Sequence, residues 1–367
     1  MNSNLLHQVA LTMVPNIGPV QARILVEQFG DATAVFTAKT TALENLEGIG
    51  SIRAKNIKSF RDFTTAEKEI SFMQQYGITP LFITDAGYPR RLLNCYDPPT
   101  LLYYKGTADL NNAKVLAIVG TRSKTEYGRQ LTEKLIADLE AQQVLVVSGL
   151  ALGIDAAAHK AAIKQGMATV AVMAHGLHTV YPAEHRPLAK NILSAGGGLL
   201  TEFRSQVAPD KHNFPSRNRV VAGMSDATIV VETDVKGGSM ITAELAAGYN
   251  RDVFAFPGRT TDTKSAGCNL LIKNNKAMLL TGAADIIDLL GWADKKLKPA
   301  SPQRALFLQL SADEQKIVAV LQQKETMAID ELHTSTALSN SLLAAAMLQL
   351  ELQNVVTSLP GKRYRLV

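Results

Sequence analysis

Short apolar runs alternate with longer stretches of mixed polarity from residue 113 onward, and this alternation is the clearest structural pattern in the chain. Most of the runs are rich in β-branched or other apolar residues, as in strands buried on both faces of a sheet. The predicted strands are Leu116–Val119, Val144–Ser148, Thr169–Met173, Gly198–Thr201, Thr228–Glu232 and Val253–Phe256. Helix-length stretches fit between most of them. The pattern therefore predicts an α/β fold with a doubly wound, mostly parallel sheet.

A weak internal repeat in residues 1–66 predicts a separate helical domain. Its two copies centre on Val14–Pro19 and Leu46–Ser51, and each places a tight, glycine-containing turn between two helices. Both copies resemble the helix-hairpin-helix motif, whose turn contacts backbone phosphate. Such hairpins also serve as scaffolding or as protein-contact modules, and the pattern leaves these roles open.

The segment 67–293 carries the predicted sheet, with a further short strand at Pro80–Ile83 and turn-punctuated segments around Tyr88–Leu93 and Pro98–Tyr103. Residues 294–305 are rich in Lys, Pro and Ser and are predicted to form a linker.

Residues 306–367 predict a small winged-helix domain. Its helices are expected at Asp313–Gln323, behind the N-cap Ser311, at Ile329–His333 and at Ser339–Gln353. A hairpin turning at Pro360-Gly361 completes it. The third helix is poor in Lys and Arg, so a protein-contact or structural role is as consistent with the pattern as DNA binding.

Composition adds little to this outline. The chain has 367 residues, of which 46% are hydrophobic, and 38 Lys and Arg against 33 Asp and Glu give a net charge of +5. This modest excess favours an acidic partner such as nucleic acid, although many enzymes are as basic.

Cys95 and Cys268 lack metal-site or disulfide spacing. No signal peptide or span of ~20 apolar residues is visible, so we expect a cytoplasmic protein without membrane contact.

The segment 211–219 combines cations with an aromatic ring at a predicted helix start. Lys211, Arg217 and Arg219 supply positive charge, Phe214 could stack on a base, and Pro215 suits the first turn of a helix. Phosphate binds favourably at a helix N-terminus, and Arg offers planar donors to phosphate oxygens. The alternative is a solvated basic helix start with a buried Phe.

Glycine- and hydroxyl-rich turns follow the first, second and fifth predicted strands. They contain Gly120-Thr121-Arg122, Ser148-Gly149 and Gly237-Gly238-Ser239 with Thr242. Arg122 stands where a dinucleotide fingerprint needs its second glycine, so that fingerprint is absent. Because ligands of parallel sheets lie outside the carboxyl ends of the strands, we expect these turns and segment 211–219 to meet at one rim.

No catalytic constellation stands out in the sequence. Asp155 and His159 are four residues apart on one predicted helix face, where they could act as a metal pair or an acid/base pair. Two ligands are too few for a metal site, and we favour a structural Asp–His hydrogen bond. We expect no catalytic residue, cofactor or metal.

Ordered motifs across residues 80–290 resemble the bacterial DNA-processing protein DprA (Smf) family. They are Gly120-Thr121-Arg122 with Tyr127-Gly128, Ser148–Asp155 with Ala158-His159, Phe214-Pro215-x-Arg217-Asn218-Arg219 and Gly237-Gly238-Ser239-x-x-Thr242-Ala243. The resemblance implies an extended Rossmann domain that binds single-stranded DNA, forms a homodimer and loads the recombinase RecA. It further implies a role in DNA uptake, natural transformation (competence) and homologous recombination. Single-strand-binding protein would be a further partner.

The same resemblance implies the DNA-binding residues. Arg122 and Lys211 would bind phosphate, and Phe214 would contact a base. Arg217, Asn218 and Arg219 would line the pocket. Main-chain and hydroxyl contacts would come from the turns, whose members are Gly120, Thr121, Ser148, Gly149, Gly237, Gly238, Ser239 and Thr242. Leu152 stands where some members of the family carry a basic residue.

Two other functions are alternatives to strand binding. A Rossmann-type nucleotide phosphoribohydrolase would carry Pro-Gly-Gly-x-Gly-Thr-x-x-Glu after a strand. Here Gly237, Gly238 and Glu244 fit, but Lys236, Met240 and Ile241 replace the Pro, Gly and Thr. A purely structural scaffold would leave the cations at the rim unexplained. The sequence therefore favours a non-enzymatic DNA-binding protein.

Overall fold

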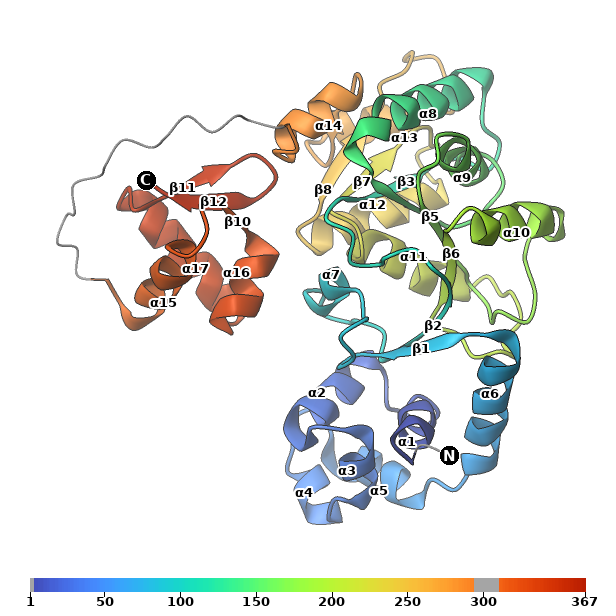
Figure 1. The fold of residues 1–367 in the computed structure, drawn as a ribbon, viewed down its shortest axis with the longest axis vertical. Helices are drawn as coiled ribbons and strands as arrows, with labels where there is room; N and C mark the ends of the chain where they lie inside the picture. Colours follow the sequence, from blue (N-terminus) through green and yellow to red (C-terminus); the bar gives the residue numbers. More distant parts are fainter. Residues whose placement is uncertain (1–2, 294–309) are drawn as a thin grey trace. The chain divides into compact units, whose positions relative to one another are not determined.

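The computed structural model describes residues 3–293 and 310–367, drawn in Figure 1. The chain divides into two compact units, residues 1–280 and 281–367, which are described separately below. The predicted linker 294–305 lies outside the described residues. No helix among those described combines the length and the apolar character needed to cross a bilayer.

Short helices around two tight turns form the N-terminal part of the first unit. They are α1 Ser3–Leu11, α2 Pro19–Phe29, α3 Ala32–Thr37, α4 Thr40–Glu44 and α5 Gly50–Ser59. The turns before α2 and α5 contain Asn16 and Gly48, both with positive φ (64° and 81°), at equivalent positions of the sequence repeat. Arg53 of α5 ties the turns together by donating to the carbonyl oxygens of Asn16 (3.0 Å) and Gly48 (3.1 Å). Each predicted hairpin is therefore present.

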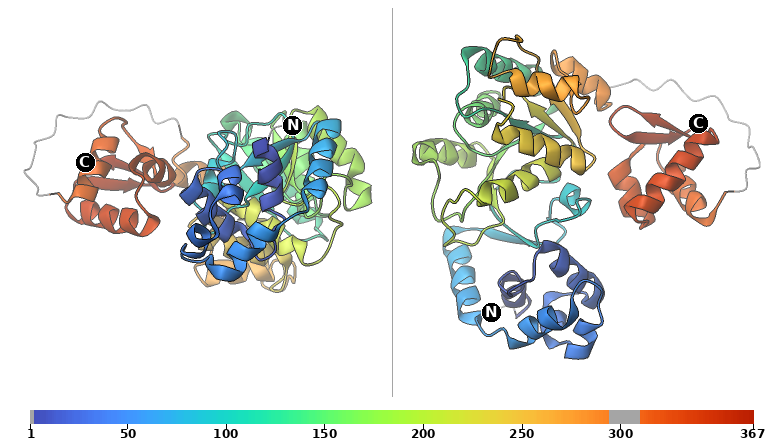
Figure 2. Two further views of the ribbon diagram at one scale, coloured as in Figure 1. Left: turned by 90° about the horizontal axis from the view of Figure 1, so that it is seen from below. Right: turned by 180° about the vertical axis from the view of Figure 1, so that it is seen from behind.

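Helix α6, Phe63–Tyr76, leads from this helical part into a nine-stranded sheet (Figures 1 and 2). The strands are β1 Thr79–Phe82, β2 Leu101–Gly106, β3 Val115–Val119, β4 Leu145–Ser148, β5 Thr169–Val172, β6 Gly198–Thr201, β7 Ala227–Val230, β8 Asp252–Ala255 and β9 Met278–Leu279. Their order is β1-β2-β6-β5-β4-β3-β7-β8-β9. Strands β3 to β9 pair in parallel, whereas β1 and β2 extend one edge in antiparallel fashion.

The central strands are buried along their whole length, because their apolar side chains are covered on both faces. All six predicted parallel strands are present within one or two residues of their expected bounds, and the strand predicted at Pro80–Ile83 is β1. Two strands were missed. The sequence predicts a turn-punctuated segment in place of strand β2, because Pro98 and Pro99 precede it. In the structure Leu101–Tyr104 are buried and pair with β1, and Tyr103–Gly106 pair with β6. Strand β9 has only two residues, too few for a recognisable pattern.

Helices cover both faces of the sheet. They are α7 Arg90–Leu93, α8 Glu126–Asp138, α9 Ile154–Lys164, α10 Arg186–Ser194, α11 Asn213–Gly223, α12 Gly238–Gly248 and α13 Ala266–Lys273, with 3-10 turns η1 Glu140–Gln142 and η2 Ala183–His185. Helices α8, α9 and α10 pack side by side, as do α11 and α12. Right-handed crossovers place these two sets on opposite faces, because the chain runs outward from β3 in one direction through β6 and then returns to β7. Helix α11 begins at Asn213, so Pro215 lies in its first turn as predicted.

The second unit contains α14 Ala283–Leu289 and the predicted winged helix. The latter comprises α15 Ala312–Leu321, α16 Ile329–Thr336, α17 Asn340–Leu352, β10 Met327–Ala328, β11 Val356–Leu359 and β12 Arg363–Leu366. Ser311 caps α15 as expected, with its Oγ accepting from the Glu314 amide (3.3 Å) while Glu314 accepts from the Ser311 amide (2.7 Å). The sheet order is β10-β12-β11, and the short β10 was not predicted.

Candidate nucleic-acid interface

A cavity of about 350 Å³ opens at the carboxyl ends of β3, β4 and β7. It lies where the winding of the sheet reverses, because β3 is flanked by β4 on one side and by β7 on the other. Open α/β sheets bind ligands at this position. The turns after these three strands and the start of α11 all line the cavity. The predicted convergence of the four sequence features on one rim is therefore confirmed.

Two exposed cations reach this cavity from different elements. Arg122 follows β3, and Lys211 immediately precedes α11. Neither forms an ion pair with a carboxylate among the described residues. Their positive charges are therefore free to attract an anion such as a phosphate group.

The N-terminus of α12 supplies neutral donors to the same space. Gly237 is the N-cap of this 11-residue helix, and Gly238, Ser239 and Thr242 line the cavity with it. Ser239 is buried, and its Oγ has no hydrogen-bond partner among the described residues. Free backbone N–H groups and the helix dipole at such a terminus favour an anion. Together with the two cations, this end of α12 makes a cradle for phosphate.

Arg217 forms the floor of the cavity instead of an exposed contact. Its side chain is buried, and Nη1 donates to the carbonyl oxygens of Gly149 and Val172, the latter at 2.7 Å. A Cβ at position 149 would lie 2.3 Å from Arg217 Nη1, so any larger residue would displace this guanidinium. Burial lowers the pKa of Arg217 and raises that of Asp155, while the attraction between the two groups opposes both shifts. We conclude that Arg217 holds the turn after β4 in place.

Two of the predicted pocket residues lie outside the cavity. Arg219 points into the core, where its guanidinium pairs with Glu202 and with Asp97 (3.3 Å). Ser148 is fully buried, and its hydroxyl donates to the carbonyl oxygen of Ile118 (2.6 Å). The prediction that these side chains line the pocket is therefore wrong. Asn218 does line it, and its Oδ1 accepts from Arg217 Nε at 3.1 Å.

Asp155 and His159 do not form the hydrogen bond that their spacing predicts. Asp155 accepts from the amides of Gly149 (3.1 Å) and Ala151 (3.3 Å). His159 Nδ1 instead bonds Thr169 Oγ1 (2.7 Å), and burial lowers the pKa of this histidine to about 3. Both are structural groups. Within residues 3–293 and 310–367, no cluster of three His, Cys, Asp or Glu side chains could hold a metal ion.

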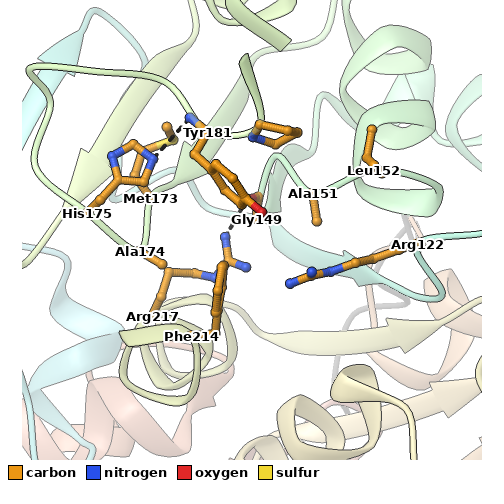
Figure 3. Close-up of a pocket in the computed structure, with 11 residues that line it drawn as sticks. Arg122, Gly149, Ala151, Leu152, Met173, Ala174, His175, Tyr181, Phe214 and Arg217 are labelled. Atoms are coloured by element: carbon orange, nitrogen blue, oxygen red, sulfur yellow. Dashed lines mark hydrogen bonds between the residues drawn. The ribbon is translucent and has the colours of Figure 1, made fainter. Parts of the chain in front are cut away.

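The sequence interpretation overlooked the loop after β5, which carries more lining residues. Figure 3 shows His175 and Tyr181 from this loop facing Phe214 and Arg122 across a second pocket. The same loop contributes Met173, Ala174 and Pro182 to this lining, and the turn after β4 contributes Ala151 and Leu152. The position of this loop in the sequence could have indicated its role. It follows the third predicted strand and therefore lies at the same edge of the sheet as the other turns.

Comparison with known proteins agrees with this geometry. Residues 79–291, more than half of the chain, match the family described as DNA recombination-mediator protein A. The chain belongs to this family. Residues 298–362 match the DprA winged helix domain, and residues 9–61 match a SAM-like tandem of helix-hairpin-helix motifs. The domain types expected at both ends are thereby confirmed.

Individual relatives extend the likeness along the whole chain. Protein Smf of Synechocystis is 32% identical, and the alignment covers 99% of each chain. The X-ray structure of DprA from Streptococcus pneumoniae superposes with a TM-score of 0.65 at 33% identity, over 78% of this chain and 97% of that one. DprA from Helicobacter pylori gives a TM-score of 0.52 at 30% identity, over 59% and 97%, and its structure is described in terms of a single-stranded-DNA-binding mode.

The DprA family consists of DNA-processing and DNA-binding proteins and is not a family of catalytic enzymes. The phosphoribohydrolase alternative also fails on geometry. Glu244, the carboxylate that its motif would use, does not line the cavity and instead lies 3.4 Å from Lys276 on the exposed side of α12. The family thus supports the non-enzymatic interpretation of the sequence.

Proposed function

We propose that this protein binds single-stranded DNA without sequence preference in the cavity between β3, β4 and β7. One observation carries the proposal: Arg122 and Lys211, which form no ion pair among the described residues, and the open N-terminus of α12 face the same cavity. These groups recognise phosphate, which is common to every nucleotide, so the contact carries no base information. The strand-binding mode described for the Helicobacter relative supports the choice of a single strand.

The residues proposed to contact the strand are those predicted from the sequence that also line the cavity. Arg122 and Lys211 bind phosphate, and Phe214 contacts a base. Arg217 and Asn218 form the floor and wall beneath them. The remaining contacts come from the turns, at Gly120, Thr121, Gly149, Gly237, Gly238, Ser239 and Thr242.

We further propose that the bound strand is passed to RecA in the cytoplasm by a homodimer of this chain, with a role in natural transformation and recombination. The family description as a recombination mediator supports this step. Single-strand-binding protein would then be the competitor that is displaced. The proposed domains are residues 1–66, 67–293 and 306–367. The segment 294–305 is the proposed linker between the second and the third.

The double variant Arg122→Ala/Lys211→Ala tests the site. We expect a loss of affinity for oligo-dT of at least tenfold, because two phosphate-neutralising charges are removed. Each phosphate contact on a single strand contributes ~0.7 to the magnitude of the slope of log affinity against log salt concentration. Losing two contacts should therefore reduce this magnitude by about 1.4. The far-UV circular dichroism spectrum should not change. RecA nucleation on strands coated with single-strand-binding protein should decline in parallel.

Lys160→Ala/Lys190→Ala is the matched control. These lysines are exposed on α9 and α10, away from the cavity, and their removal changes net charge equally. If both double variants lost affinity to the same extent, general charge would explain binding and the proposed site would be rejected.

A further inference from the structure

The turn that carries Arg122 is held by a carboxylate from another strand. Glu232 follows β7 and is 1% exposed. Its Oε2 accepts from the backbone amide of Thr125 (3.0 Å), and its Oε1 accepts from the Thr125 hydroxyl (2.5 Å). Its carbonyl oxygen accepts from the amide of Thr121 (2.7 Å). Glu232 therefore fixes the backbone on both sides of Arg122.

The same carboxylate fixes the start of helix α8, into which this turn leads. Thr125 is the N-cap of α8, and its hydroxyl accepts from the Gly128 amide (3.1 Å). A Cβ at position 128 would lie 2.1 Å from Glu232 Oε2, so the carboxylate lies against the first turn of the helix. A negative charge is favourable at a helix N-terminus. The N-terminus of α8 is therefore stabilised by a group of the protein itself.

Glu232 does not line the cavity proposed to bind the strand. It lines a separate cavity, together with Thr125 and Tyr127. No Lys or Arg among the described residues forms an ion pair with it. Burying a carboxylate costs free energy unless hydrogen bonds replace its contacts with water. Here those hydrogen bonds come from Thr125, so the carboxylate and the turn stabilise each other.

We propose that Glu232 is a positioning residue for Arg122: it holds the turn after β3 so that the guanidinium is presented to the phosphate of a bound strand. The inference rests on the proposed strand-binding function, in which Arg122 binds phosphate. A turn that is already ordered does not have to be ordered on binding, so less of the interaction free energy is lost. Lys211 reaches the cavity from the segment before α11 and should not depend on Glu232.

Fluorescence anisotropy of the full-length chain with labelled oligo-dT tests this role. Glu232→Gln keeps the size of the side chain but has one acceptor oxygen instead of two, so one hydrogen bond from Thr125 is lost. The affinity should fall about fivefold, the effect of one hydrogen bond. Its salt dependence should shift toward that of Arg122→Ala. Thr125→Val should act in the same way, whereas Thr125→Ser, which keeps the hydroxyl, should retain the native affinity.

Double variants distinguish positioning of Arg122 from a general effect on stability. Glu232→Gln should cause little further loss in Arg122→Ala, because it acts through Arg122, and should cause its full loss in Lys211→Ala. Glu69→Gln is the matched control, because Glu69 is also buried and also accepts from the amide and the hydroxyl of one residue, Ser205. This control should change the affinity less than twofold.

Hydrogen–deuterium exchange of residues 120–125, without DNA, measures the order of the turn itself. Exchange should be faster in Glu232→Gln than in the native chain, and equal exchange would overturn the inference. Native affinity in Glu232→Gln would also overturn it, as would equal losses in Arg122→Ala and Lys211→Ala, because the role of Glu232 would then be structural alone. If the native chain failed to bind oligo-dT, the proposed function would be refuted, while the exchange rates would still decide whether Glu232 orders the turn.

Discussion

Individual arginines close together in the sequence have different roles in the folded chain. Arg217 is buried under the turn after β4 and donates hydrogen bonds to backbone carbonyl oxygens, whereas Arg219 forms ion pairs with Asp97 and Glu202. Among the described residues that line the cavity, Arg122 and Lys211 are the exposed cations, and neither forms an ion pair there. The positive charge available to DNA is therefore smaller than the spacing of the motif suggested.

Removing Arg219 should affect stability more than binding. Its side chain is 11% exposed, and Tyr249 joins the network through its hydroxyl, which donates to Asp97 Oδ1 (2.5 Å). Arg219→Ala leaves two carboxylates without their cation, so the free energy of unfolding should fall by about 3 kcal/mol. Urea unfolding followed by circular dichroism measures this change. Lys211→Ala, by contrast, should lower the affinity for DNA and leave the free energy of unfolding almost unchanged. If Arg219→Ala lowered mainly the affinity and Lys211→Ala mainly the stability, the roles given to these two residues would be contradicted.

At the level of secondary structure, the N-terminus of α12 is the element on which the proposed phosphate contact depends. Its cap is a glycine and its first turn has no acidic side chain, so the positive end of the helix dipole stays open to the cavity. A helix optimised for stability alone would carry an acid there. The absence of one from this turn is consistent with a ligand that supplies the negative charge.

Gly238→Asp should therefore separate stability from binding. A Cβ at position 238 meets no atom within 4 Å, so the substitution fits, and an acid at the first helical position stabilises a helix by roughly 0.3–1 kcal/mol. The thermal midpoint should stay equal or rise, while affinity for oligo-dT should fall at least tenfold through repulsion of phosphate. Gly238→Asn is the neutral control of the same size. Equal binding by the two variants would show that no phosphate lies at this helix end.

At the level of the whole molecule, the described units differ in their suitability for phosphate. Helix α17 occupies the third-helix position of the winged helix but contains no Lys or Arg. Its exposed large side chains include Leu342, Leu348 and Leu352. A helix with this surface lacks the donors that contact a DNA backbone.

A chain ending at residue 293 should bind oligo-dT within about twofold of the full-length protein. The proposed phosphate contacts all lie between residues 120 and 242, and none is lost by this truncation. Anisotropy titrations of both chains at the same salt concentration measure the difference. A loss of more than tenfold would show that the winged helix or the segment before it contributes to strand binding.

Local patterns were sufficient for most of the helices and strands and for the edge of the sheet at which the cavity opens. Buried β-branched runs predicted the six central strands, and their order along the chain placed the turns at 120–122, 148–149 and 237–239 on one rim. These inferences succeed because side-chain periodicity and turn chemistry depend on neighbours in sequence. Strands β2 and β9 were not predicted because their local patterns are weak. Strand β9 is very short, and β2 begins directly after two prolines and Thr100.

The amino-acid sequence by itself determined the α/β architecture, the hairpin and winged-helix domains, and the edge of the sheet at which the cavity opens. Only the tertiary structure decided which cations stay free, since Arg219 is neutralised by Asp97 and Glu202 from distant parts of the chain. It also brought Tyr181 and His175 to the pocket. The physical reason is that ion pairing and exposure depend on which segments pack together, and that packing joins residues far apart in sequence.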